Sequence, residues 1–152
     1  MTLHTFRAEL WLPRPRPEVF TFFADARNLE AITPPWVNFQ VLTPGPIVME
    51  VGTLIDYRLR IHGFPFRWRT EITAWDPPFR FADTQLRGPY RRWVHTHIFE
   101  DSNGGTLCRD EVSYAVLGGA LIERLFVRRD VERIFAFRQE AMRRVLGGAA
   151  AP

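Results

Sequence analysis

One stretch decides the fold: Trp93-Val94-His95-Thr96-His97-Ile98-Phe99. Its side chains alternate, which predicts a β-strand because successive side chains of a strand point to opposite faces. The residues that share one face are Trp93, His95, His97 and Phe99. Two imidazoles between two large aromatic rings are typical of the polar floor of an apolar cavity, and they are also half of a metal site.

Strand patterns continue on both sides of this stretch. Turn signals built from Gly, Pro and Asn separate them, because Gly and Asn accept positive φ and Pro fixes φ. The predicted strands are residues 3–12, 37–43, 52–61, 64–75, 79–87, 91–100 and 105–116. Connections as short as these join antiparallel neighbours, so the last six strands are expected to form a meander.

Helices are predicted in two places. Pro17 suits the first turn of one short helix, and Asn28 is expected to cap a second over residues 28–33. Residues 120–146 lack Gly and Pro and read as one long helix. Its stripe at near-helical spacing comprises Val127, Val131, Ile134, Phe135, Arg138, Met142 and Val145. The fold class is therefore α+β, with a curved antiparallel sheet of about seven strands wrapped around a long C-terminal helix.

Composition narrows the function. A chain of 152 residues favours a single domain, expected over residues 1–147 with a disordered tail at 148–152. All twenty basic residues are Arg, and they are dispersed among acidic residues, so no nucleic-acid partner is expected. The single cysteine, Cys108, excludes an internal disulfide and a Cys-based zinc cluster.

The sequence shows no signal peptide and no apolar stretch of membrane-spanning length. A soluble, cytoplasmic protein without integral membrane association is the resulting expectation, and the oligomeric state is left open.

Turn lengths predict which residues face one another across the sheet. The expected pairs are Leu59 with Phe66, Tyr57 with Trp68, Ile72 with Phe81, Thr70 with Asp83, Phe81 with His97, Asp83 with His95, His97 with Asp110 and His95 with Val112. The inner face then carries aromatic and titratable side chains, whereas Arg, Asp and Glu gather on the outer face. The predicted ligand contacts are Tyr57, Trp68, Phe81, Asp83, Gln85, Trp93, His95, His97, Phe99, Asp110 and Tyr114.

Buried carboxylates need partners, because burying an isolated charge costs several kcal/mol. We therefore expect Asp83 to pair with His95 and Asp110 with His97. Such a network can be purely structural, can orient a ligand, or can supply a general base. A metal site lacks a clear third ligand, so neither a metal nor a cofactor is expected.

Two further motifs carry a resemblance to a known family. Pro15-Arg16-Pro17-Glu18-Val19-Phe20, followed by Asp25-Ala26-Arg27-Asn28-Leu29, resembles the start of the SRPBCC superfamily. This group includes START lipid-transfer domains, aromatic polyketide cyclases and the birch-pollen allergen type. The run from Gly88 to Phe99, with its Trp-x-His-x-His-x-Phe pattern, looks like a bacterial ligand-binding branch. The resemblance spans nearly the whole chain and implies the helix-grip fold with an apolar pocket, but no particular ligand.

Three functions follow as hypotheses. The first is a protein that binds a hydrophobic or amphipathic small molecule between the sheet and the C-terminal helix. The second is an enzyme of cyclase or dehydratase type, with His95 or His97 as general base and Asp83 or Asp110 behind it. The third is a protein–protein adaptor with a filled core and no ligand.

Overall fold

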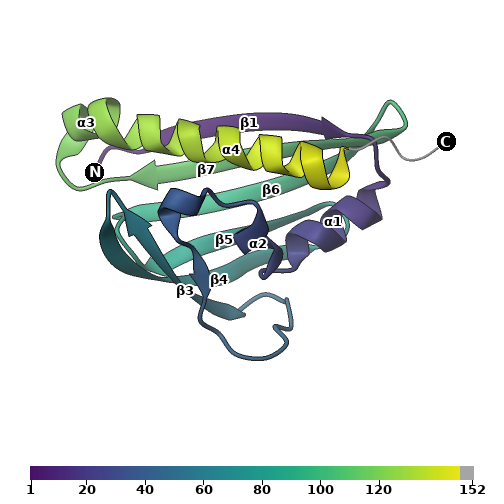
Figure 1. Ribbon diagram of the computed structural model, residues 1–152, viewed down its shortest axis with the longest axis horizontal. Helices are drawn as coiled ribbons and strands as arrows, with labels where there is room; N and C mark the ends of the chain where they lie inside the picture. The colour runs from purple at the N-terminus through teal and green to yellow at the C-terminus, as the bar shows by residue number, and fades with distance from the viewer. Residues whose placement is uncertain (148–152) are drawn as a thin grey trace.

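The computed structural model describes residues 1–147, and the expected tail at 148–152 lies outside them. Seven antiparallel strands form one curved sheet in the order β1-β7-β6-β5-β4-β3-β2 (Figure 1). The strands are β1 (His4–Leu12), β2 (Gln40–Val41), β3 (Leu54–Ile61), β4 (Phe64–Asp76), β5 (Arg80–Arg87), β6 (Arg92–Ser102) and β7 (Gly105–Ala115). The meander predicted from the turn signals is confirmed.

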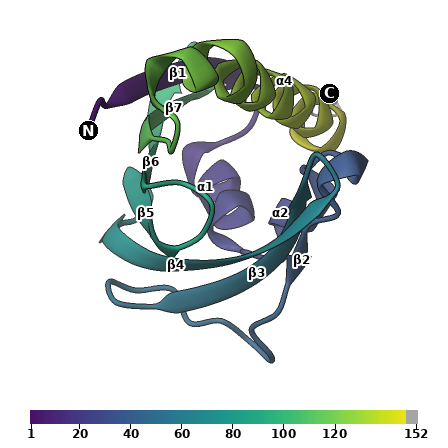
Figure 2. The same cartoon turned by 90° about the vertical axis from the view of Figure 1, so that its left-hand side faces the viewer.

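The helices lie on the concave side of this sheet. They are α1 (Arg16–Ala24), α2 (Asn28–Ala31), α3 (Gly119–Ile122) and α4 (Arg128–Leu146). α1 contacts β6 and β7, and α4 contacts β1. β1 is one edge of the sheet, and β2 and β3 lie at the other edge. Figure 2 shows the sheet curling around α1 and α2, with α4 closing the upper side. This is the α+β helix-grip architecture that the sequence predicts.

Most of the predicted strand pairing is confirmed. Leu59 lies opposite Phe66, Asp83 opposite His95, and His97 opposite Asp110. The pairing of β4 with β5 is wrong by two residues, because Ile72 lies opposite Asp83 instead of Phe81. The turn after Asp76 is longer than expected, and a β-bulge between Ile72 and Ala74 adds one residue to β4. A displacement of two residues keeps the same side chains on the inner face.

Several helix and strand boundaries also differ from expectation. No strand begins at Val37, because Pro35–Val37 forms a 3-10 turn and Asn38 adopts a left-handed φ of 47°. Asn28 does not cap α2; its side chain donates to the Phe22 carbonyl oxygen at 2.9 Å. α2 accordingly spans fewer residues than predicted.

The long C-terminal helix is interrupted by a π-helical turn at Glu123–Val127. In this turn Glu123 is buried and accepts hydrogen bonds from the Tyr114 hydroxyl at 2.8 Å and from Arg128 Nε at 2.9 Å. The predicted stripe is correct at Val131, Phe135 and Met142, which are buried. It is wrong at Val145, because the i+4 step from Met142 leads to Leu146, which is buried instead.

The core beside the concave face is aromatic. Phe99 is buried on β6, and its ring lies 5.4 Å from Phe20 and 5.2 Å from Phe23, both on α1. Contacts of this kind anchor α1 to the sheet. Within residues 1–147, no helix is long and apolar enough to cross a membrane.

Removing the Phe99 ring should therefore destabilise the whole fold. We expect Phe99→Ala to lower the free energy of unfolding by about 3–5 kcal/mol, the usual cost of a large-to-small change in a core. Urea unfolding measures this directly. Phe64→Ala is the matched control, because Phe64 is 69% exposed and its loss should change stability by about 0.5 kcal/mol or less. Equal effects of the two substitutions would contradict the placement of the core.

Candidate ligand-binding site

A cavity lies between the concave face of the sheet and α4. Its outer chamber has a volume of about 440 Å³, and an inner chamber adds about 140 Å³. The residues that line both chambers are Leu29, Phe39, Leu59, Trp68, Trp93, His95 and Arg138. This shared lining places the two chambers next to each other, with the inner chamber against the inner face of the sheet.

Seven of the predicted ligand contacts line this space. Trp68, Trp93 and His95 line both chambers, whereas Tyr57, Phe81, Asp83 and His97 line the inner chamber. They come from β3, β4, β5 and β6, which the alternation of side chains brings to one face.

The other four predicted contacts lie outside both chambers. Gln85 is hydrogen-bonded to the backbone of Tyr90, and Phe99 packs against α1. Tyr114 donates its hydroxyl hydrogen to Glu123, and burial together with that bond raises the pKa of Tyr114 to about 12. Asp110 contacts the site through His95, at 2.7 Å, and through His97, at 3.5 Å. Direct ligand contact by these four residues stays a prediction.

Sequence reasoning did not assign several lining residues to the site. Trp36 belongs to the 3-10 turn, Phe39 lies just before β2, and Tyr90 lies in the β5–β6 connection. Large aromatic residues in irregular segments were the available signal, since such rings contribute large apolar contact areas. Arg138 belongs to the predicted helix stripe but is not among the predicted ligand contacts.

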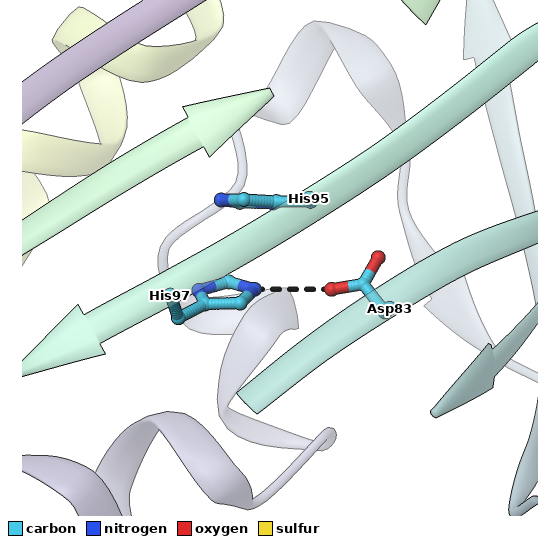
Figure 3. Close-up of side chains that lie close together, drawn as sticks. All are labelled: Asp83, His95 and His97. Atoms are coloured by element: carbon cyan, nitrogen blue, oxygen red, sulfur yellow. Dashed lines mark hydrogen bonds and ion pairs between the residues drawn. The ribbon is translucent and has the colours of Figure 1, made fainter. Parts of the chain in front are cut away.

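Two imidazole–carboxylate pairs lie at the inner chamber, which Asp83, His95 and His97 line. His97 Nε2 donates to Asp83 Oδ2 at 3.0 Å (Figure 3), and His95 Nε2 donates to Asp110 Oδ1 at 2.7 Å. The donor is the ring nitrogen, because an ionised carboxylate can only accept. The two rings stack with their centroids 3.7 Å apart.

The expected partners within this network are wrong. Asp83 pairs with His97 instead of His95, and Asp110 bonds His95 more closely than His97. The backbone register is as predicted, so the difference arises in the side chains. Side chains lean along a strand, and a diagonal neighbour two residues away lies within reach of a long or planar side chain.

Burial and pairing shift the pKa values in this network. Burial lowers the pKa of His97 to about 4, and the charge of His95 acts in the same direction. Burial alone would raise the pKa of Asp83, but the hydrogen bond from His97 and the nearby positive charges hold it below its usual value. The same balance, with His95 as hydrogen-bond donor, places the pKa of Asp110 far below its usual range. Near neutral pH both carboxylates are therefore ionised and His97 is neutral.

Asp83, His95 and His97 are also the residues that could hold a metal ion. One ligand atom from each lies within 4.8 Å of the others. In the described structure, Asp83 and one nitrogen of each imidazole are already hydrogen-bonded, and zinc would need these atoms at about 2.0–2.2 Å from the ion. The absence of a resident metal stays a prediction.

The fold and the cavity together define a protein of the helix-grip class. Residues 12–141 match the family model described as polyketide cyclase / dehydrase and lipid transport. The chain belongs to this family, as the two sequence motifs indicated. No curated protein matches the sequence significantly.

Solved structures show the same fold at low sequence identity. Ginseng major latex-like protein 151 from Panax ginseng matches with a TM-score of 0.71 and 12% identity, over 95% of this chain and 97% of its own. Protein Ms6760 from Mycobacterium smegmatis gives 0.69 and 18%, over 93% and 89%. Zhui aromatase/cyclase from Streptomyces sp. R1128 gives 0.67 and 16%, over 97% and 99%.

The His97–Asp83 pair should appear as an energetic coupling. His97→Ala leaves a buried carboxylate without its donor and should cost about 1–3 kcal/mol. Because Asp83→Ala removes the same hydrogen bond, a double-mutant cycle should give a coupling of about 0.5–3 kcal/mol. His97→Ala combined with Asp56→Ala, on the outer face, is the additive control. Additivity of His97→Ala and Asp83→Ala would show that the pair does not form.

The lowered pKa of His97 predicts a stability loss in mild acid. Between pH 6.5 and 4 the unfolded chain binds a proton at this residue and the folded chain does not, so stability falls as pH falls. The slope is at most about 1.4 kcal/mol per pH unit. Because the pKa values of Asp83 and Asp110 are lowered, protonation of these two carboxylates reduces the stability of the fold only below about pH 4.

The free energy of unfolding of the wild-type protein and of His97→Asn, measured at pH 7, 6 and 5, isolates the contribution of His97 to the pH dependence. The stability advantage of the wild-type protein should shrink toward pH 5. An advantage that grows as pH falls would mean that His97 is charged in the folded state.

Proposed function

We propose that the protein binds an apolar or amphipathic small molecule in the cavity between the sheet and α4. The observation that carries the proposal is the outer chamber of about 440 Å³, which lies within the volume range of small-molecule sites. Its aromatic lining consists of Trp36, Phe39, Trp68, Tyr90, Trp93 and Phe135. A few polar groups at the inner end would orient the molecule.

The cavity favours binding over a purely adaptor role. A filled core would bring the sheet and α4 into contact throughout, whereas Val131 and Phe135 face open volume on one side. The family description covers both cyclase or dehydrase activity and lipid transport, and each of these roles needs room for an apolar molecule. The absence of a nucleic-acid partner and the cytoplasmic location stay predictions.

A cyclase or dehydratase activity is the second candidate, and His95 favours it. Its ring lines both chambers, and Asp110 accepts the proton of Nε2 at 2.7 Å. Asp110 thereby fixes the tautomer and leaves Nδ1 as the nitrogen with a free lone pair, as a general base requires. His97 fits this role less well, because its Nδ1 is buried from solvent.

The enzyme hypothesis has its own test. A soluble poly-β-ketone substrate should yield a cyclised or dehydrated product with the wild-type protein. His95→Gln should abolish the turnover but retain binding of the substrate. If the wild-type protein binds the substrate but forms no product, the enzyme hypothesis is wrong and the binding function alone remains.

Loss of the Trp93 side chain should weaken binding of an apolar dye. Trp93 lines both chambers, so Trp93→Ala removes contact area at the centre of the site. Nile red fluorescence should rise saturably with the wild-type protein, and its Kd should increase about tenfold or more in the variant.

Trp11→Phe is the matched control. Trp11 donates to the Ser102 carbonyl oxygen at 2.7 Å and lines neither chamber, so its loss should leave the Kd unchanged. Dye binding that fails to saturate, or that Trp11→Phe weakens as much as Trp93→Ala, would contradict the proposed site.

A further inference from the structure

Arg138 is a charged cavity residue with two buried donor atoms that have no acceptor among the described residues. It projects from α4 and lines both chambers. Its Nε and Nη2 atoms are buried and have no hydrogen-bond partner. No carboxylate among residues 1–147 forms an ion pair with it. A buried donor without an acceptor costs about 1–3 kcal/mol, and more when charged, so this arrangement requires an explanation.

Aromatic rings surround the guanidinium of Arg138 but offer no hydrogen-bond acceptor to its Nε and Nη2 atoms. Its central carbon lies 5.5 Å from the ring centroid of Phe23 and 5.7 Å from that of Phe135. The inner carboxylates are near enough for the charge of Arg138 to lower their pKa values, but among the described residues neither carboxylate forms a hydrogen bond or ion pair with Arg138. The aromatic rings hold the guanidinium in place, and its Nε and Nη2 donors are buried without an acceptor.

Arg16 provides a useful contrast. Its Nε is also buried without a partner, but its Nη2 lies 3.3 Å from Asp101 Oδ2, so the charge is compensated. Besides Arg138, two arginines line the outer chamber, and each has an interaction partner. Arg60 donates to the Gly63 carbonyl oxygen, and Arg133 lies over the ring of Trp36. Arg138 alone among these four combines buried donors with no acceptor.

The two unpartnered atoms define what can bind. Nε–H and one Nη2–H lie on the same edge of the planar guanidinium and point in parallel, which matches the two oxygens of a carboxylate. We propose that Arg138 binds the carboxylate of an aromatic or polycyclic acid whose apolar body fills the outer chamber. This inference rests on the proposed binding function and specifies its ligand class.

A phosphate fits this position less well. A phosphate carries a charge near minus two at neutral pH, and phosphate sites commonly combine several donors or cations. Here a single guanidinium faces an inner chamber that already contains Asp83 and reaches Asp110 through His95. A carboxylate carries one negative charge and two acceptor oxygens in a plane, which matches the single guanidinium with two unpartnered donors.

Two probes of nearly identical shape test the proposal. 2-Naphthoate and its neutral amide, 2-naphthamide, are titrated separately into the full chain at pH 7 by isothermal calorimetry. Because charge-assisted bidentate hydrogen bonds are made only to the acid, the wild-type protein should bind 2-naphthoate about tenfold or more tightly than 2-naphthamide. Arg138→Met should remove this preference and leave the amide affinity nearly unchanged. Arg138→Lys, which keeps the charge and loses the fork, should retain only part of it.

Arg129→Met is the control, since Arg129 lies on the same helix, is exposed and lines neither chamber. Equal wild-type affinities for acid and amide would overturn the carboxylate inference while leaving the binding function intact. A preference that survives in Arg138→Met would also overturn it. Failure of both probes to bind would count against the proposed function itself. If Arg138→Met does not fold, the wild-type comparison and Arg138→Lys decide the matter.

Discussion

The structure depends on one constraint: the same set of side chains must face inward across every turn of the meander. A slip of one residue at any turn would bring the outer charges, such as the Asp56–Arg69 ion pair, into the cavity. The turn between β4 and β5 displaces the pairing by an odd number of residues relative to a two-residue turn, which would exchange the inner and outer faces of β5. The bulge at Ile72–Ala74 adds one residue to β4 and returns the inner side chains to the same face. Because the inner face is preserved through to β7, aromatic rings, imidazoles and carboxylates all reach the concave face.

Gathering titratable groups on a buried face has a physical consequence, because each must find a partner in the interior. Two imidazoles and two carboxylates are hydrogen-bonded to one another in diagonal pairs. Arg138 lies on α4 and forms no hydrogen bond with this network. The network accounts for the polar inner end of the cavity, and the unpartnered guanidinium is the group that we assign to the ligand.

Much of this arrangement follows from the sequence, because turn length and period-two alternation determine which residues share a face. The inner positions of β6 could be predicted for that reason. The bulge in β4 could not, since the residues around Thr73 carry no signal for it. Nor does alternation specify how far a side chain leans along its strand, so the partners of Asp83 and Asp110 were exchanged. Trp36 and Tyr90 reach the cavity from irregular segments, where no periodicity applies.

The indole N–H signals of the five tryptophans test the central claim most directly. Trp36, Trp68 and Trp93 line the cavity, whereas Trp11 and Trp75 lie outside both chambers. A two-dimensional ¹H–¹⁵N titration with 2-naphthamide, which does not depend on Arg138, should shift the first three signals saturably and leave the other two in place. Saturable shifts confined to Trp11 or Trp75, or no saturable shift at all, would contradict a ligand site between the sheet and α4.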